Sequence, residues 1–229
     1  EIDLNMKNFR PCRETIGSIY KIGVPSILMQ SLGSLTTFCM NNILLMFTST
    51  AATVFGVYFK LQSFIFMPVF GLTNGMIPIV AFNYGARNKK RIQQTIKLSV
   101  VIAVSIMLAG LALFQLAPTS MLRLFDASEH MLEIGVPALR TISLSFVFAG
   151  YCIVTSSVFQ ALGNGVYSLV LSLARQLIII IPVAFAFAKL FGLDMVWYAY
   201  PIAEVASVII CSVLLKRIFR LKLKNLEQE

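Results

Sequence analysis

Polar side chains recur at helical spacing inside the apolar stretches of this sequence, and they are its first candidates for chemistry. Gln30, Ser34, Thr37 and Asn41 are separated by four, three and four residues, which places them on one face of a helix. At membrane depth such groups either bond a neighbouring helix or line a hydrated cavity. Because Gln and Asn are larger than helix packing requires, we favour a cavity lining.

A second row of this kind follows in the next apolar stretch. It contributes two further polar candidates for the cavity lining, Lys60 and Asn74. The members of the row lie at helical spacing, so they share one face: Lys60, Ser63, Met67, Gly71 and Asn74.

The same stretch contains residues that favour a bent helix. Pro68 and Pro78 each remove an intrahelical hydrogen bond, and Gly71 and Gly75 allow another backbone to approach closely. A bend in a helix that lines a cavity is a candidate gate, and close packing around a bend is the structural alternative.

Ionisable residues inside apolar stretches form a third group of candidates. Arg175 and Glu204 lie at similar depths in consecutive stretches, so they are expected to meet across adjacent antiparallel helices, and Lys60 could reach the same layer. The pair would act either as a helix-locking ion pair or as a protonatable site coupled to movement. We favour the lock, because a facing arginine keeps the acid charged.

Enzymatic chemistry finds no support in the sequence. It contains no nucleophile and base pair, no glycine loop for phosphate and no metal-ligand spacing, and its one histidine, His130, follows a polar turn. We therefore expect no enzyme, no metal and no cofactor.

The elements that must position these residues are long apolar helices. Hydrophobic residues make up 58% of the 229 and charged residues 13%, and the mean hydropathy is +0.82. A span of a bilayer core needs about 20 apolar residues. Six stretches meet this requirement and predict an all-α integral membrane bundle: 22–48, 53–84, 96–116, 134–161, 167–188 and 195–215.

The basic residues sort to one side of these spans and set their orientation. Fourteen of the nineteen Lys and Arg residues fall at the ends and loops of that side, so both termini are expected in the cytoplasm. The predicted organisation is a cytoplasmic lead-in (1–21), a membrane lobe (22–219) and a cytoplasmic tail (220–229). The net charge of +9 is then explained by the orientation of the spans in the membrane, and a nucleic-acid partner is disfavoured.

Five of the six spans resemble a known transporter family. The chain is similar to the C-terminal half of a multidrug and toxic compound extrusion (MATE) transporter of the bacterial drug-efflux branch. The stretches that carry the resemblance are KIGVPSILMQ (21–30), FMPVFGLTNGMIPIVAFNYGARNKKRI (66–92), IGVPALR (134–140), FQALGNGVYSLVLSLARQ (159–176) and WYAYPIAE (197–204).

The resemblance implies a twelve-helix transporter of the cell membrane, in which two six-helix lobes surround a central cavity. Such a protein exports lipophilic cations in exchange for protons or sodium, so this chain would need a separate N-terminal lobe and an ion gradient rather than a cofactor. Some family members carry a carboxylate on the first helix of this lobe as part of a cation site. Here that helix has Gln30, Ser34 and Asn41 instead, which favours coupling to protons over sodium.

Two alternative functions remain at this stage. Flippases of lipid-linked oligosaccharides resemble these transporters in architecture, but several basic residues facing a pyrophosphate would be expected, and the polar rows are weakly charged. The other alternative is a membrane scaffold module that does not transport.

Overall fold

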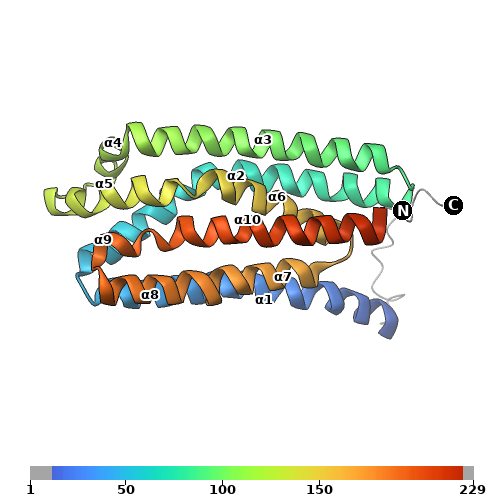
Figure 1. Ribbon diagram of the computed structural model, residues 1–229, viewed down its shortest axis with the longest axis horizontal. Helices are drawn as coiled ribbons and strands as arrows, with labels where there is room; N and C mark the ends of the chain where they lie inside the picture. Colours follow the sequence, from blue (N-terminus) through green and yellow to red (C-terminus); the bar gives the residue numbers. More distant parts are fainter. Residues whose placement is uncertain (1–11, 224–229) are drawn as a thin grey trace, which may run out of the picture.

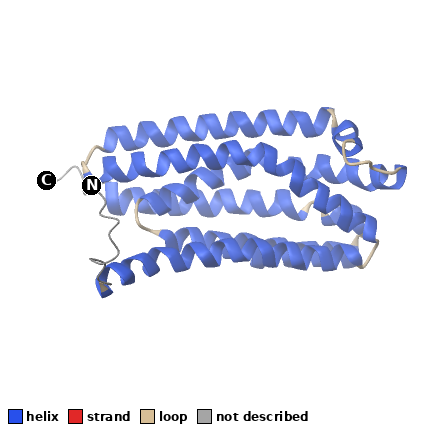
Figure 2. Ribbon diagram, turned by 180° about the vertical axis from the view of Figure 1, so that it is seen from behind, coloured by secondary structure: helices blue, strands red, loops and turns tan. Residues whose placement is uncertain are grey.

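The computed structural model describes residues 12–223, apart from the side chains of residues 18, 21, 22, 26 and 223, and these residues form helices joined by short turns (Figures 1 and 2). The elements are α1 (Arg13–Leu45), α2 (Ser49–Gly85), α3 (Lys89–Leu116), α4 (Pro118–Arg123), α5 (Glu129–Ser143), α6 (Phe146–Ala161), α7 (Gly165–Leu173), the π-helical segment η2 (Ala174–Ile180), α8 (Ile181–Leu190), α9 (Leu193–Val196), α10 (Ala199–Ile218) and the π-helical turn η3 (Phe219–Leu223).

The first three predicted spans correspond to α1, α2 and α3, and each helix extends beyond its apolar stretch. The extension is clearest in α3, which begins at Lys89 rather than near residue 96. The cause is a cap: the Asn88 side chain accepts a hydrogen bond of 3.0 Å from the backbone amide of Arg91. Side-chain caps thus mark the starts of α2 and α3, at Thr48 and Asn88, whereas apolar runs indicate only which part of each helix suits a bilayer.

Two predicted spans are broken in the structure. The span predicted over 134–161 consists of α5 and α6, which are bent by 49° at a short break. Gln115 of α3 supports the break, because its amide donates to the Arg140 carbonyl at 2.8 Å and to the Ser143 hydroxyl at 3.0 Å. The span predicted over 167–188 runs through α7, η2 and α8, so a π-helical segment interrupts its middle.

Length and composition qualify three helical stretches of the described residues for crossing a membrane: Ser49–Gly85, Lys89–Leu116 and Gly165–Leu190. The bent pair of α5 and α6 adds a fourth if it forms one span. The residue boundaries predicted for the membrane lobe stay a prediction, and most of the lead-in and the tail lie outside the described residues.

The core lies where α2, α3, α6 and α10 pack together, and close approach of helices depends on glycine. A methyl group added at Gly150 of α6 would lie 2.9 Å from Cγ of Met107 on α3, which is closer than packed atoms approach. Trp197 is fully buried against Phe55, with ring centroids 6.4 Å apart. A tryptophan at the start of a membrane span commonly lies in the belt of aromatic residues at the membrane surface. Trp197 is instead buried by packing against another helix.

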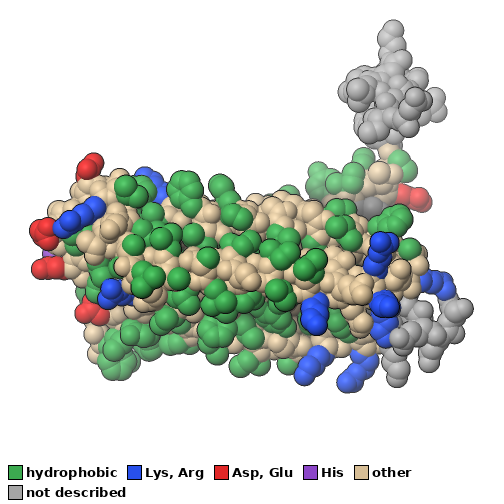
Figure 3. All heavy atoms as spheres, turned by 90° about the horizontal axis from the view of Figure 1, so that it is seen from above, with side chains coloured by type: hydrophobic (Ala, Val, Ile, Leu, Met, Phe, Trp, Pro, Cys, Tyr) green, Lys and Arg blue, Asp and Glu red, His purple; other side chains and the backbone are tan. Residues whose placement is uncertain are grey.

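Charge separates the two ends of the molecule (Figure 3). Lys and Arg side chains gather at the end that carries the α2–α3 loop and the end of α10, whereas acidic residues cluster at the other end, and hydrophobic side chains cover much of the surface between them (Figure 3). At the basic end, Lys222 of η3 donates to the Leu162 carbonyl at 2.5 Å and lies over the Tyr84 ring, 5.4 Å from its centroid.

Candidate functional site: an exposed polar face and a buried ion pair

The polar row of α1 lies largely on the outside of the bundle. Gln30 and Ser34 are exposed, and Thr37 and Asn41 are half-buried. The Thr37 hydroxyl donates to the Gly33 carbonyl of its own helix at 3.0 Å. Because the bundle covers this row only in part, its exposed residues are available to whatever packs on this face.

The row of α2 has the same character. Asn74 is exposed, and so are Pro68, Gly71, Gly75 and Pro78, although α2 continues through all of them as one α-helix. The gate assigned to these four residues therefore stays a prediction, and it has no break in the helix to support it.

The glycines of this row differ from the expectation drawn from the sequence. Close approach of another backbone was expected at Gly71 and Gly75, yet a methyl group added at either would meet no atom within 4 Å in the described chain. The space beside them is open. Gly71 and Gly75 are four residues apart, so they lie on one side of α2, and both are exposed there.

Lys60 does not join the layer of Arg175 and Glu204, so that expectation was wrong. Its ammonium group lies 5.7 Å from the centroid of the Phe125 ring, in the segment between α4 and α5. The reason is helical geometry: Tyr58 faces the core of the bundle, and a residue two positions further along an α-helix is turned by about 200°. Lys60 is therefore exposed.

Arg175 and Glu204 meet, as their depths in the sequence indicated. Nη1 of Arg175 donates to Oε1 of Glu204 at 2.9 Å, which joins η2 to α10. The Glu204 side chain is 10% exposed and that of Arg175 27%. A charge-assisted bond of this length in a mostly buried site fits a structural link between the two helices. Whether it also takes part in coupling stays a prediction.

The second oxygen of this carboxylate has no partner among the described residues. Oε2 of Glu204 is buried without a hydrogen bond, and so is the hydroxyl of Tyr200, one turn earlier on the same face of α10. Tyr58 of α2 packs near Tyr200, with ring centroids 6.3 Å apart. Hydroxyl groups and a carboxylate oxygen therefore gather in the core beside the ion pair.

Sequence reasoning missed a second polar link between helices. The Thr36 hydroxyl of α1 contacts Oε1 of Gln176 at 3.1 Å, and both side chains are buried. The adjacent residues Arg175 and Gln176 of the π-helical segment η2 bond different helices, α10 and α1. A polar residue next to Arg175 in an apolar run was a usable signal, but helical spacing at 3.6 residues per turn cannot predict a π-helix.

Comparison with known proteins decides the family. A profile of the MatE family matches residues 25–186, which is most of the chain. The chain belongs to the MatE family. Its relatives include the multidrug export protein MepA of Staphylococcus haemolyticus (strain JCSC1435), which is 29% identical over 203 residues, or 89% of this chain and 44% of MepA. MepA of Staphylococcus aureus (strain MSSA476) is 30% identical over 204 residues, or 89% of this chain and 45% of that protein.

Solved structures give the same result for the fold of this MatE chain. An outward-facing multidrug resistance MATE family transporter of the MOP superfamily matches all of the chain with a TM-score of 0.88 and 25% identity, over 51% of its own length. The MatE chain thus spans about half the length of the relatives that it matches. Its fold is that of one half of a MATE transporter.

Proposed function

We propose that this chain is the C-terminal lobe of a secondary active multidrug exporter, which moves lipophilic cations by alternating access in exchange for an ion. The observation that carries the proposal is the polar face of α1 and α2, which the lobe leaves uncovered. Gln30, Ser34, Lys60 and Asn74 are exposed there. An N-terminal lobe, supplied outside this chain, would close over that face and turn it into a cavity wall.

The helices that carry the face are arranged to receive a partner. α1 and α2 are joined through residues 46–48 and diverge toward the basic end (Figure 1). Gly71 and Gly75 leave open space on the exposed side of α2, where a second bundle could approach closely. In a membrane, small residues on exposed helix faces favour contact between bundles more than contact with lipid tails.

The chemistry of the face favours large cations with apolar surface. Exposed aromatic and thioether side chains stand beside the polar rows, and they include Phe38, Phe64 and Met67, with 67%, 75% and 68% of each residue exposed. Aromatic faces attract cations, and methionine adapts to varied shapes. The single ammonium group of Lys60 is too little positive charge to favour a pyrophosphate-linked substrate, so the exporter is preferred over the flippase.

We favour antiport coupled to protons over antiport coupled to sodium, because residues 22–48 contain no carboxylate for a cation site. Glu204 is the one acidic residue within the predicted spans, and Arg175 already holds one of its oxygens. We therefore place the coupling carboxylate in the other lobe and assign the Glu204 pair a structural role.

Transport by the full-length protein that contains this chain tests the proposal. The protein would be reconstituted in liposomes with ethidium as the substrate, and a pH gradient or a sodium gradient would be imposed separately. We expect ethidium flux with the pH gradient, and none from this chain reconstituted alone. Gradient-dependent flux from the chain alone would contradict the half-transporter assignment.

Single substitutions then test the face. Gln30→Ala and Asn74→Ala should alter ethidium transport, while Gln94→Ala, an exposed amide on α3, should leave it unchanged. Equal rates for all three variants would remove these residues from the cavity. Glu204→Gln should reduce stability and leave coupling intact; loss of coupling in a normally folded protein would instead make Glu204 the coupling group.

A further inference from the structure

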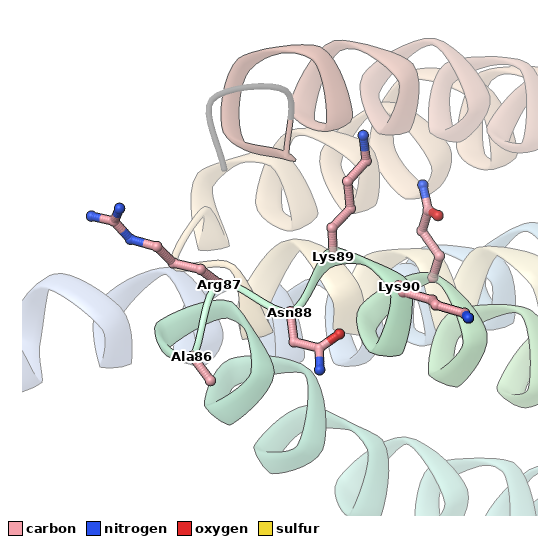
Figure 4. A pocket seen from close by; sticks show the side chains of 6 residues that line it. Ala86, Arg87, Asn88, Lys89 and Lys90 are labelled. Atoms are coloured by element: carbon pink, nitrogen blue, oxygen red, sulfur yellow. The ribbon is translucent and has the colours of Figure 1, made fainter. Parts of the chain in front are cut away.

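Two hollows at the basic end of the molecule meet at one residue, Gln93. The first is a polar hollow of about 600 Å³, lined by residues 86–88 of the α2–α3 loop and by Lys89, Lys90 and Gln93 at the start of α3 (Figure 4). The second is an apolar groove of about 290 Å³ that also begins at Gln93. Because both are lined by Gln93, a basic hollow and an apolar groove adjoin at this residue.

The groove runs along one face of α3. Gln93, Lys97 and Val100 follow each other at intervals of four and three residues, so they share that face, and Lys90 lies one turn before Gln93. Leu215 of α10 and Phe219 of η3 form the opposite wall, and Tyr151 of α6 also lines it. Along α3 the groove therefore changes from basic to apolar within about two turns.

The apolar groove is held in shape by a polar contact behind it. The Tyr151 hydroxyl and the Ser212 hydroxyl lie 3.2 Å apart, which connects α6 with α10. The ring of Tyr151 is thus fixed in position where it lines the groove, and an acyl chain could pack against it without ordering the wall first.

The polar hollow lies in a part of the sequence that is rich in basic residues. The chain contains no Asp or Glu between Glu14 and Asp126, whereas the loop and the start of α3 contribute five basic residues: Arg87, Lys89, Lys90, Arg91 and Lys97. The side chains of Lys89 and Lys90 are spread apart in the hollow, and that of Arg87 points away from them (Figure 4). An anion with several oxygens suits this arrangement better than a neutral headgroup.

We propose that this feature is a binding site for an anionic phospholipid of the leaflet at the basic end. The phosphate would lie against Lys90, Gln93 and Lys97, and one acyl chain would lie in the groove against Val100, Tyr151 and Phe219. A free phosphate would use only the first part, and a neutral phospholipid only the second. The combination is what distinguishes an anionic lipid from either.

The purified chain tests this site directly by native mass spectrometry in detergent. Phosphatidylglycerol should bind with a defined stoichiometry, and phosphatidylcholine should compete weakly. Lys97→Gln and Lys90→Gln should each weaken phosphatidylglycerol binding about fivefold, the factor that corresponds to roughly 1 kcal/mol per basic residue at a membrane surface. Val100→Trp should fill the groove and reduce binding of the lipid without changing the affinity for glycerol phosphate.

Matched variants control for general effects of charge and bulk. Arg123→Gln removes an exposed charge at the other end of the molecule, and Leu98→Trp enlarges an exposed residue of α3 outside the groove. Both should bind phosphatidylglycerol as the parent chain does, and unchanged far-ultraviolet circular dichroism would establish folding. Equal affinity for the two lipids, full competition by glycerol phosphate, or equal losses in the control variants would each overturn the proposal.

Discussion

Thr36 and Thr37 are adjacent on α1, yet their hydroxyls have different roles. Each hydroxyl lies within hydrogen-bond distance of the carbonyl four residues earlier, Thr36 at 2.8 Å from Leu32 and Thr37 at 3.0 Å from Gly33. Thr36 is also buried and lies 3.1 Å from Oε1 of Gln176, so it adds a contact between helices to the local bond that both residues make.

We expect Thr36→Val to lower the free energy of unfolding by about 0.6–1 kcal/mol, because a hydrogen bond between membrane helices is typically worth about that much. Thr37→Val should change it little, since the Gly33 carbonyl keeps its bond within the helix. Denaturant unfolding of the chain in detergent micelles measures both. Equal losses for the two variants would contradict the link through Gln176.

The ion pair of η2 and α10 gives a second prediction for single residues. Glu204→Gln and Arg175→Gln should each destabilise the lobe by about 2–3 kcal/mol, slightly below the usual cost of breaking a fully buried pair, because Arg175 is 27% exposed. The double variant should lose less than the sum of the two. Thermal unfolding of the two single variants and the double variant completes a double-mutant cycle, and Lys60→Gln is the exposed control. Strict additivity would show that the two charges do not stabilise each other.

The sequence predicted the candidate residues better than it predicted their surroundings. Depth along two apolar runs was enough to pair Arg175 with Glu204, because antiparallel helices convert residue count into height. The direction in which a side chain leaves the helix was harder to predict. Lys60 faces Phe125, and Gln176, which contacts Thr36, lies in a π-helical segment that spacing alone does not reveal.

Among the helices, glycine separates the packed side of the bundle from its open side. A methyl group at Gly110 of α3 would overlap the side chain of Ile65 on α2, and one at Gly150 would approach Met107. At Gly71 it would meet nothing. The first two positions are inner contacts, and the third is on the face assigned to the other lobe.

Gly110→Ala and Gly150→Ala should therefore destabilise the chain by about 1–3 kcal/mol, since the added methyl groups overpack a close helix contact. Gly71→Ala should leave stability unchanged or raise it, because alanine favours helix by up to about 1 kcal/mol where space is free. Unfolding in detergent compares the three. A destabilised Gly71→Ala variant would mean that this side of α2 is covered within the chain itself.

The helices themselves were predictable, whereas their irregularities were not. Long apolar runs bounded by charges identified the elements, because a bilayer core demands such runs. The break between α5 and α6 has no proline at Leu144 or Ser145, and Gln115 supports it from another helix. A local pattern cannot encode a bend that depends on a residue of α3.

For the molecule as a whole, the separation of charge predicts its orientation. Lys90→Cys at the start of α3 should react with a membrane-impermeant maleimide only in inside-out vesicles, and Glu129→Cys at the other end only in right-side-out vesicles. The background would carry Cys12→Ser and Cys39→Ser, since Cys152 and Cys211 are buried. Labelling of Lys90→Cys in intact cells would reverse the predicted topology.

The chain spans about half the length of its MatE relatives. The second lobe proposed above would pack on the face of α1 and α2 that this chain leaves uncovered. Whether a second lobe is inverted or parallel relative to this one, it would have to cover α1 and α2 rather than α3. The outer surface of α3 carries the groove proposed for lipid.

The contact of Lys222 with Leu162 and Tyr84 has a mechanical consequence. Through η3, which continues α10, it ties the end of α10 to the end of α2 and to the α6–α7 turn at the basic end. In the transport cycle proposed for the full-length protein, we expect these three segments to move together at that end, so that any flexing of α2 takes place nearer to its middle.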